Sequence, residues 1–230
     1  MNRKEMKRII LLAVLLLTGV SAWGQGGNSN IPADVFYLMP TFEQGMVYIT
    51  GQQPAQGKLN ICAEDHSLRF LDDDGKEMSS KSDDIVRVVI DTVVFVRDDG
   101  AFYRIYPLTD EVSVAFRRDV EILRDAKVGA YGTVDRTSSI REYTAIHSDG
   151  VMHKLETSKN YPYRVYESCA LYKDGTIIPL NKRSLRKHFP DRKADLDAYF
   201  KSNRSLPEKL EETKAFLSRL ISGEPLSEQD

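Results

Sequence analysis

The sequence predicts an α+β protein. An antiparallel β meander or open sandwich over residues 35–180 is followed by a C-terminal segment of two to three helices over residues 181–223. In the first segment, apolar and polar residues alternate with a period of two, which is typical of half-buried strands. After Leu180 the apolar spacing becomes that of helices. Strands that are followed by helices favour an α+β arrangement, with the helices packed on one face or end of the sheet.

The first 24 residues have the pattern of a secretory signal peptide. A basic n-region precedes an apolar run over residues 9–20, and Ala22 and Gly24 form a small-x-small cleavage signal. The run is shorter than the roughly 20 residues that a membrane-spanning helix needs. We therefore expect a secreted protein, periplasmic or associated with the outer membrane, whose mature chain begins with a flexible tether at residues 25–34.

Turn signals separate the strands of the β domain. Asp-Gly pairs occur at residues 74–75, 99–100, 149–150 and 174–175. Asp and Gly tolerate the positive φ angles of tight hairpins, so each pair predicts a turn between antiparallel strands. Residues 126–142 are rich in Gly, Ser and Thr and interrupt the pattern. They predict a long surface loop, for which a functional and a disordered interpretation both stay open.

Capping residues divide the C-terminal segment into helices. Asn181 is placed to cap a short first helix, and Pro190 is placed to begin a second one. Pro207 opens a third helix, which Gly223 is suited to end. Residues 224–230 are expected to form a disordered tail.

Composition and motifs argue against several functions. The chain has 32 Lys and Arg against 34 Asp and Glu, a mildly acidic balance that does not suit nucleic-acid binding. It contains no Gly-x-Ser-x-Gly elbow. Cys62 with His66, and Ser138 or Ser139 with His147, are the pairings that a hydrolase would need, and no third group that orients the base is evident. We expect no enzymatic activity and no cofactor.

Two groups of residues suggest metal binding only weakly. Asp72, Asp73 and Asp74 precede Gly75, but the spacing does not match a calcium-binding EF-hand loop. An acidic hairpin tip is the better interpretation. His147 and His153 flank a predicted turn, and a third ligand is missing.

A strand and a helix supply the candidate binding residues. Tyr166 and Tyr172 share a strand face and suit contact with carbohydrate or protein, although Tyr is also simply favoured in strands. Arg183, Arg186 and Lys187 belong to a basic helix that suits anionic head groups, although such a helix is more often a solvated face.

Strand alternation predicts the positions of the two cysteines. Cys62 is expected to point outward with Asn60, whereas Cys169 is expected to face the core with Val165 and Leu171. An oxidising compartment permits a disulfide between the two thiols. Placement on opposite strand faces favours two free thiols instead.

The helical segment also carries a motif. It consists of Phe189-Pro190-Asp191-Arg192-Lys193, followed by Leu196, Tyr199-Phe200-Lys201 and Asn203. This motif resembles the tail of an uncharacterised family of exported proteins from Gram-negative bacteria, and the sequences at residues 59–74 and 127–132 are also similar to that family. The resemblance implies an exported protein with a β-rich body and a helical tail. It transfers no catalytic residues.

Together these observations favour a binding or accessory protein of the bacterial envelope that acts on a protein partner. A module that binds an envelope glycan or lipid is the alternative. A hydrolase is the least favoured of the three functions, because the sequence lacks a recognisable catalytic constellation.

Overall fold

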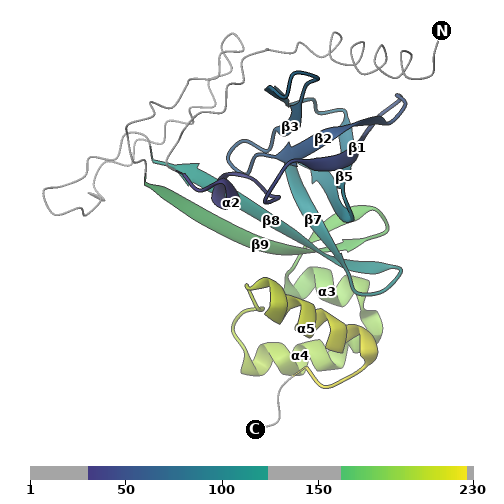
Figure 1. Ribbon diagram of the computed structural model, residues 1–230. Coiled ribbons are helices and arrows are strands. Elements are labelled where there is room, and N and C mark those ends of the chain that lie inside the picture. Colours follow the sequence, from purple (N-terminus) through teal and green to yellow (C-terminus); the bar gives the residue numbers. More distant parts are fainter. Residues whose placement is uncertain (1–30, 124–161, 227–230) are drawn as a thin grey trace, which may run out of the picture. The chain divides into compact units, whose positions relative to one another are not determined.

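A computed structural model describes residues 31–123 and 162–226 (Figure 1). These residues form ten strands, with antiparallel pairing, and helices that lie mostly late in the chain, so the expected α+β class is confirmed. None of the described helices is long and apolar enough to cross a membrane. The expected signal peptide, the long loop at residues 126–142 and the turn at residues 149–150 lie outside the described residues.

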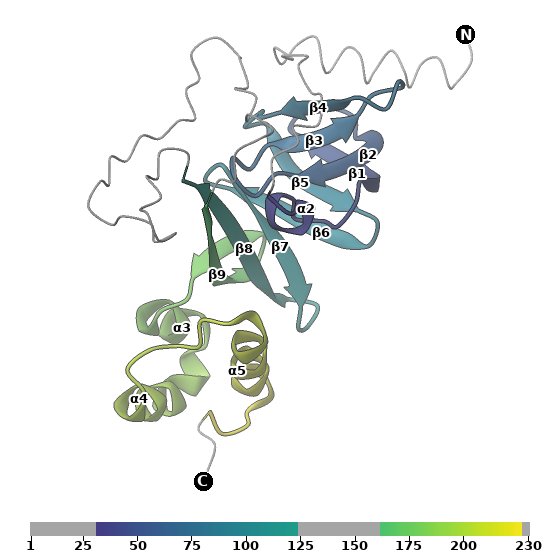
Figure 2. The ribbon, with the colours of Figure 1, turned by 60° about the vertical axis from the view of Figure 1, so that its left-hand side comes forward.

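The described residues belong to two compact units. Unit 1 contains residues 31–100, 119–123 and 162–166, and unit 2 contains residues 101–118 and 167–226. Two long strands, β8 (Val112–Ile122) and β9 (Tyr163–Lys173), contribute to both units. The remaining elements lie within one unit or the other. Figure 2 shows the strands of unit 1 from a second direction.

Unit 1 is built on a curled sheet. After the short helix α2 (Ala33–Phe36) come β1 (Glu43–Ile49), β2 (Ala55–Ile61), β3 (Leu68–Leu71), β4 (Glu77–Ser80), β5 (Ile85–Ile90) and β6 (Val93–Asp98), in the order β6-β5-β1-β2-β3-β4. Strand β5 does not pair with β4 but returns to β1, which departs from a simple meander. Four strand spacings separate β4 from β5, about 19 Å in a flat sheet. An extended link over residues 81–84 reaches at most about 18 Å, so the sheet must curl.

The end of β2 is buried on both faces, and the expectation that Cys62 points outward with Asn60 is wrong. Both residues are fully buried. The segment that follows α2 covers them: Tyr37 forms a β-bridge with Cys62, and the Asn60 side chain accepts from the backbone N–H of Met39 at 3.1 Å. The same amide group donates to the carbonyl oxygens of Met39 and Thr41, at 3.0 and 3.2 Å. A buried polar side chain is thus satisfied by the segment that buries it.

At both ends, the packed part of the chain extends further than the sequence predicts. Ile31 is buried and residues 33–36 are helical, so the prediction of a tether that reaches residue 34 is wrong for the described residues 31–34. At the other end, Leu226 is buried in the core of unit 2, so the predicted tail does not begin at residue 224. In each case, a single apolar residue within a polar stretch fixes the chain to a core.

Three of the four expected Asp-Gly turns fall within the described residues, and all three are confirmed. Gly75 has φ 76°, and the pairs Asp99-Gly100 and Asp174-Gly175 both have positive φ at each position. Two consecutive positive φ angles are the signature of a type I′ turn, whose twist matches that of the flanking strands.

Unit 2 combines a small sheet with three α-helices. The elements are β7 (Ala101–Pro107), the unit 2 parts of β8 and β9, β10 (Thr176–Pro179), α3 (Lys182–His188), the 3₁₀ turn η1 (Pro190–Arg192), α4 (Lys193–Ser202) and α5 (Leu210–Ser222). Strand β8 pairs with β7, and β9 pairs with β10. The helices pack on this part of the sheet, and their apolar stripes supply most of the core.

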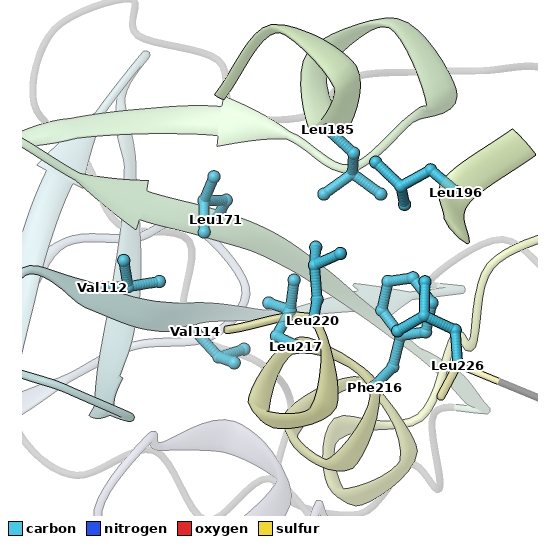
Figure 3. Packing of buried hydrophobic residues seen from close by; sticks show 9 residues of the cluster. All are labelled: Val112, Val114, Leu171, Leu185, Leu196, Phe216, Leu217, Leu220 and Leu226. Carbon is cyan, nitrogen blue, oxygen red and sulfur yellow. The ribbon is translucent and has the colours of Figure 1, made fainter. Parts of the chain in front are cut away.

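The core of unit 2 joins strands and helices in one cluster (Figure 3). Full burial of each such aliphatic side chain is worth about 1.5–3 kcal/mol. Leu171 lies between the sheet and the helices, and Tyr199 packs on Phe216 with ring centres 4.9 Å apart. The buried members are Val112, Val114, Leu171, Leu185, Leu196, Phe216, Leu217, Leu220 and Leu226.

The predicted helix caps are confirmed at two positions. The Asn181 side chain accepts from the backbone N–H of Ser184 at 2.9 Å, and Gly223 ends α5 with φ 87°. Pro190 begins the 3₁₀ turn η1, and α4 follows directly from it.

Arg192 has a role that its place in a basic stretch does not suggest. Its guanidinium group donates to the carbonyl oxygens of Arg219, Leu220 and Glu224 at 3.1, 2.6 and 2.7 Å. It also donates to Asp195 at 2.6 Å. The last carbonyls of a helix have no partner within the helix, so this arginine closes the C-terminal end of α5.

We predict that Arg192→Ala lowers the free energy of unfolding by about 1–3 kcal/mol, because three carbonyl groups lose a charged donor. Arg192→Lys should recover only part of the loss, since an ammonium group cannot reproduce the planar fork. Urea denaturation measures both. The neighbouring exposed Lys193→Ala is the control, and an equal loss in that variant would contradict the capping role.

Candidate functional site

The first residues of β9 form an exposed apolar patch. Four large hydrophobic residues are exposed in the described part of the chain: Val86 at 46%, Tyr163 at 39%, Val165 at 43% and Tyr166 at 49%. Three of these four lie within four consecutive residues. We call Tyr163, Val165 and Tyr166 the β9 patch. Such clustering marks a recognition surface more often than isolated exposed residues do.

Strand β9 is open along part of one edge. It lies between β8 and β10 in the sheet, but β10 pairs with it only over residues 170–173. Residues 163–168 are exposed without exception, so both faces of this part of the strand are accessible. Within the described part of the chain, no strand lies beside residues 163–169 on the edge away from β8.

The direction of the backbone groups in β9 follows from its two ends. Asp174-Gly175 is a two-residue turn, so Lys173 and Thr176 form the hydrogen-bonded pair next to it. Because successive residues of a strand direct their backbone groups to opposite sides, all odd-numbered residues of β9 direct their N–H and C=O groups toward the β10 side. At the other end, the carbonyl of Pro162 accepts from Leu123 N at 2.8 Å on the β8 side. Both ends therefore agree. The odd-numbered residues 163, 165 and 167 direct their backbone groups to the open edge.

Polar groups in and beside the β9 patch contact side chains of β8. The Tyr166 hydroxyl donates to Glu121 Oε2 at 2.8 Å, and an Arg164 nitrogen lies 3.8 Å from the same oxygen. On the other face, Arg118 donates to Glu167 at 3.0 Å. Each of these polar groups has a partner on β8, and the side chains of Arg164 and Glu167 nevertheless remain 53% and 45% exposed.

The structure separates the predicted binding residues by exposure. Tyr166 is exposed, whereas Tyr172 is half-buried. In α3, Arg186 forms an ion pair with Asp197 of α4. Arg183 and Lys187 are exposed on the same helix.

Sequence reasoning missed two members of the patch. Tyr163 was not singled out, and Val165 was expected to face the core with Leu171. That expectation is wrong, because Leu171 is covered by the helical cluster, whereas residues 163–168 have no covering layer on either face. The available signal was the sequence of residues 163–166, in which large residues occupy both faces of the strand.

The candidate nucleophile does not have the properties of one. Cys62 is fully buried, and burial followed by the charge of Asp65 raises the pKa of its thiol well above the ordinary value. The reactive thiolate is therefore disfavoured. His66 is also buried, and its Nε2 lies 2.9 Å from Asp119 Oδ1. Ser138, Ser139, His147 and His153 lie outside the described residues.

A buried ionic cluster lies close to Cys62 in the sequence. Arg69 is buried, 3.6 Å from Asp65 Oδ2 and 3.5 Å from Glu77 Oε1. Tyr37 donates to Glu77 at 2.9 Å, and Asp65 accepts from the backbone N–H and hydroxyl of Ser67 at 3.0 and 2.7 Å. The cluster links the segment after α2 to β3 and β4.

Titration behaviour supports a structural role for this cluster. Burial, then the Glu77 carboxylate, raises the pKa of the Tyr37 hydroxyl. Burial alone would raise the pKa of Asp65, but the Arg69 guanidinium and the hydrogen bonds from Ser67 outweigh it and hold that pKa below its ordinary value. Each charge is thus stabilised by a partner, which is the condition for burying it.

The remaining predicted groups have simple explanations. The Asp72 side chain accepts from the backbone N–H groups of Asp74 and Lys76 at 3.0 and 2.8 Å, which makes an Asx-type hairpin tip. No three His, Cys, Asp or Glu side chains in residues 31–123 and 162–226 are grouped so that they could hold a metal ion. Cys62 and Cys169 are both free thiols in the structure.

Comparisons with protein-family models, with curated proteins and with solved structures found no match to this chain.

We predict that Asp65→Asn lowers the free energy of unfolding at pH 7 by about 1–3 kcal/mol, because Arg69 loses a charged partner. The folded-state pKa of Asp65 is lowered, so its contribution is fully present above its unfolded value of about 4 and is lost as the pH falls through the folded value. The difference between the two proteins should therefore shrink below about pH 4. Denaturant titrations at pH 7 and pH 3 measure it.

The exposed Asp98→Asn is the matched control for Asp65→Asn. It should change stability little at either pH, since surface carboxylates contribute little. A stability difference for Asp65→Asn that stays constant from pH 7 to pH 3 would contradict the proposed role of the ionised carboxylate.

Proposed function

We propose that this chain is an exported, non-enzymatic envelope protein that binds an extended segment of a protein partner along the open edge of β9. The observation that carries the proposal is the β9 patch, which combines exposed apolar side chains with backbone groups directed to the same open edge. The signal-peptide pattern of the first 24 residues supports a periplasmic or outer-membrane-associated location.

Edge recognition of this kind uses two sources of free energy. Backbone hydrogen bonds to the added strand supply affinity, and alternate side chains supply specificity. In β9, Tyr163 and Val165 lie on one face, and Tyr166 lies on the other. An added strand would therefore meet apolar surface on both faces of the sheet, which suits a polypeptide, whose side chains alternate between the two faces.

A glycan- or lipid-binding module is the second candidate function. The exposed Arg183 and Lys187 favour it, since cations on one helix attract phosphate or carboxylate head groups. The ion pair of Arg186 with Asp197 reduces the charge that this helix offers. The glycan- or lipid-binding function is therefore the second candidate.

We predict that a photo-crosslinking amino acid at position 163 captures a protein partner in intact cells, whereas the same amino acid at the exposed position 86 does not. Val165→Pro should reduce the yield at least about tenfold, because proline removes the outward-directed N–H and leaves the β8 pairing intact. Val165→Ala keeps the N–H and is the control. Adducts of equal yield from positions 163 and 86, or an adduct yield that Val165→Pro does not change, would contradict the proposal.

A further inference from the structure

We propose that two copies of this chain pair antiparallel through the open edges of their β9 strands, so that the binding edge is masked until a partner displaces the second copy. This inference rests on the proposed function for the use of the edge. It adds a regulatory state that can be tested on the purified protein alone.

Symmetry limits how two identical strands can pair. A two-fold axis perpendicular to the sheet keeps each side chain on its own face of the sheet. An odd-numbered residue can therefore lie opposite only an odd-numbered residue, and an even-numbered residue opposite only an even-numbered one. It follows that one residue of β9 must lie directly opposite its own copy, and the axis passes between these two copies. An axis at Tyr163 would pair the rest of the β9 patch with positions outside β9, which begins at Tyr163. The remaining candidate centres in and beside the patch are Arg164, Val165, Tyr166 and Glu167.

Charge excludes two of these centres. Pairing centred on Arg164 would place two guanidinium groups directly opposite each other, and pairing centred on Glu167 would do the same with two carboxylates. Like charges that face each other across strands are destabilising. The axis is thus restricted to Val165 or Tyr166.

The register centred on Val165 pairs complementary side chains. Val165 meets the second copy's Val165, Arg164 meets the second copy's Tyr166, and Tyr163 meets the second copy's Glu167. These are an apolar pair, a cation over an aromatic ring and a hydroxyl opposite a carboxylate. A register centred on Tyr166 would instead set Val165 opposite the second copy's Glu167. An apolar side chain cannot donate a hydrogen bond to that carboxylate.

The backbone is compatible with this register. Residues 163, 165 and 167 direct their N–H and C=O groups to the open edge, and this register pairs them only with one another. Every register whose axis lies at a single residue likewise pairs odd-numbered residues only with odd-numbered ones. Arg164 and Tyr166 then form the closer, non-hydrogen-bonded pairs, with Cα atoms about 4.5 Å apart, where side chains interact most strongly.

The occupant is a second copy because the edge is complementary to itself. When the five residues from Tyr163 to Glu167 are reversed about Val165, the tyrosine hydroxyl meets the carboxylate and the guanidinium meets the second tyrosine ring. The contact is short, smaller than a standard stable interface, so the pair should form reversibly. Reversibility is what allows a partner segment to exchange for the second copy.

Disulfide trapping tests the register. In a Cys169→Ser background, Val165→Cys should give a covalent dimer under mild oxidation, because Cα atoms of a hydrogen-bonded pair are about 5.5 Å apart, within the range for a disulfide. Tyr163→Cys is the matched control. In this register its two copies are about 14 Å apart and should remain monomeric. Trapping at position 163, or through Tyr166→Cys in place of Val165→Cys, overturns the register.

Sedimentation at several protein concentrations tests the association itself. The mature protein should show a monomer–dimer equilibrium, and Val165→Lys should raise the dissociation constant at least about tenfold. Val86→Lys, which alters the exposed apolar residue outside β9, should leave it unchanged. A protein that stays monomeric up to about 1 mM overturns the inference. The proposed function would survive that result if crosslinking in cells still depends on Val165.

Discussion

A buried polar group must find a partner inside the protein, and this constraint organises both units. Asn60 satisfies the backbone of the segment that covers β2, and Arg69 is buried only because Asp65 and Glu77 accompany it. In unit 2, Arg192 supplies the donors that the end of α5 lacks. The open edge of β9 is exposed instead, so water can solvate the outward backbone groups of residues 163, 165 and 167.

The sequence predicts well those features whose cause is local. Asn181 caps α3 and Gly223 ends α5 because the atoms involved are within a few residues of each other. The Asp-Gly turns follow from the same kind of cause. The burial of Cys62 was mispredicted because alternation assumes that one strand face meets water, whereas a distant segment, residues 36–41, covers that face. No local pattern reports which segment returns to cover a strand.

The candidate site shows the same division. Tyr166 was selected from its strand face and is exposed, but Val165 was assigned to the core because it shares a face with Leu171. Alternation fixes which side of a strand a residue lies on and not whether another layer reaches that far along it. The helical cluster covers Leu171. Six residues earlier the same face is open, and only the three-dimensional structure gives that limit.

Exposed edge strands are usually protected by charges that point outward, by proline or by short length. Residues 163–168 of β9 contain no proline. The two charged residues of this stretch, Arg164 and Glu167, lie near partners on β8, and their side chains are 53% and 45% exposed. Tyr163, Val165 and Tyr166 are exposed beside them. An edge that exposes apolar side chains and backbone hydrogen-bonding groups is costly to leave unoccupied, because it invites nonspecific association. The proposed occupation of this edge, by a second copy or by a partner segment, would remove this cost and would leave the edge available for exchange.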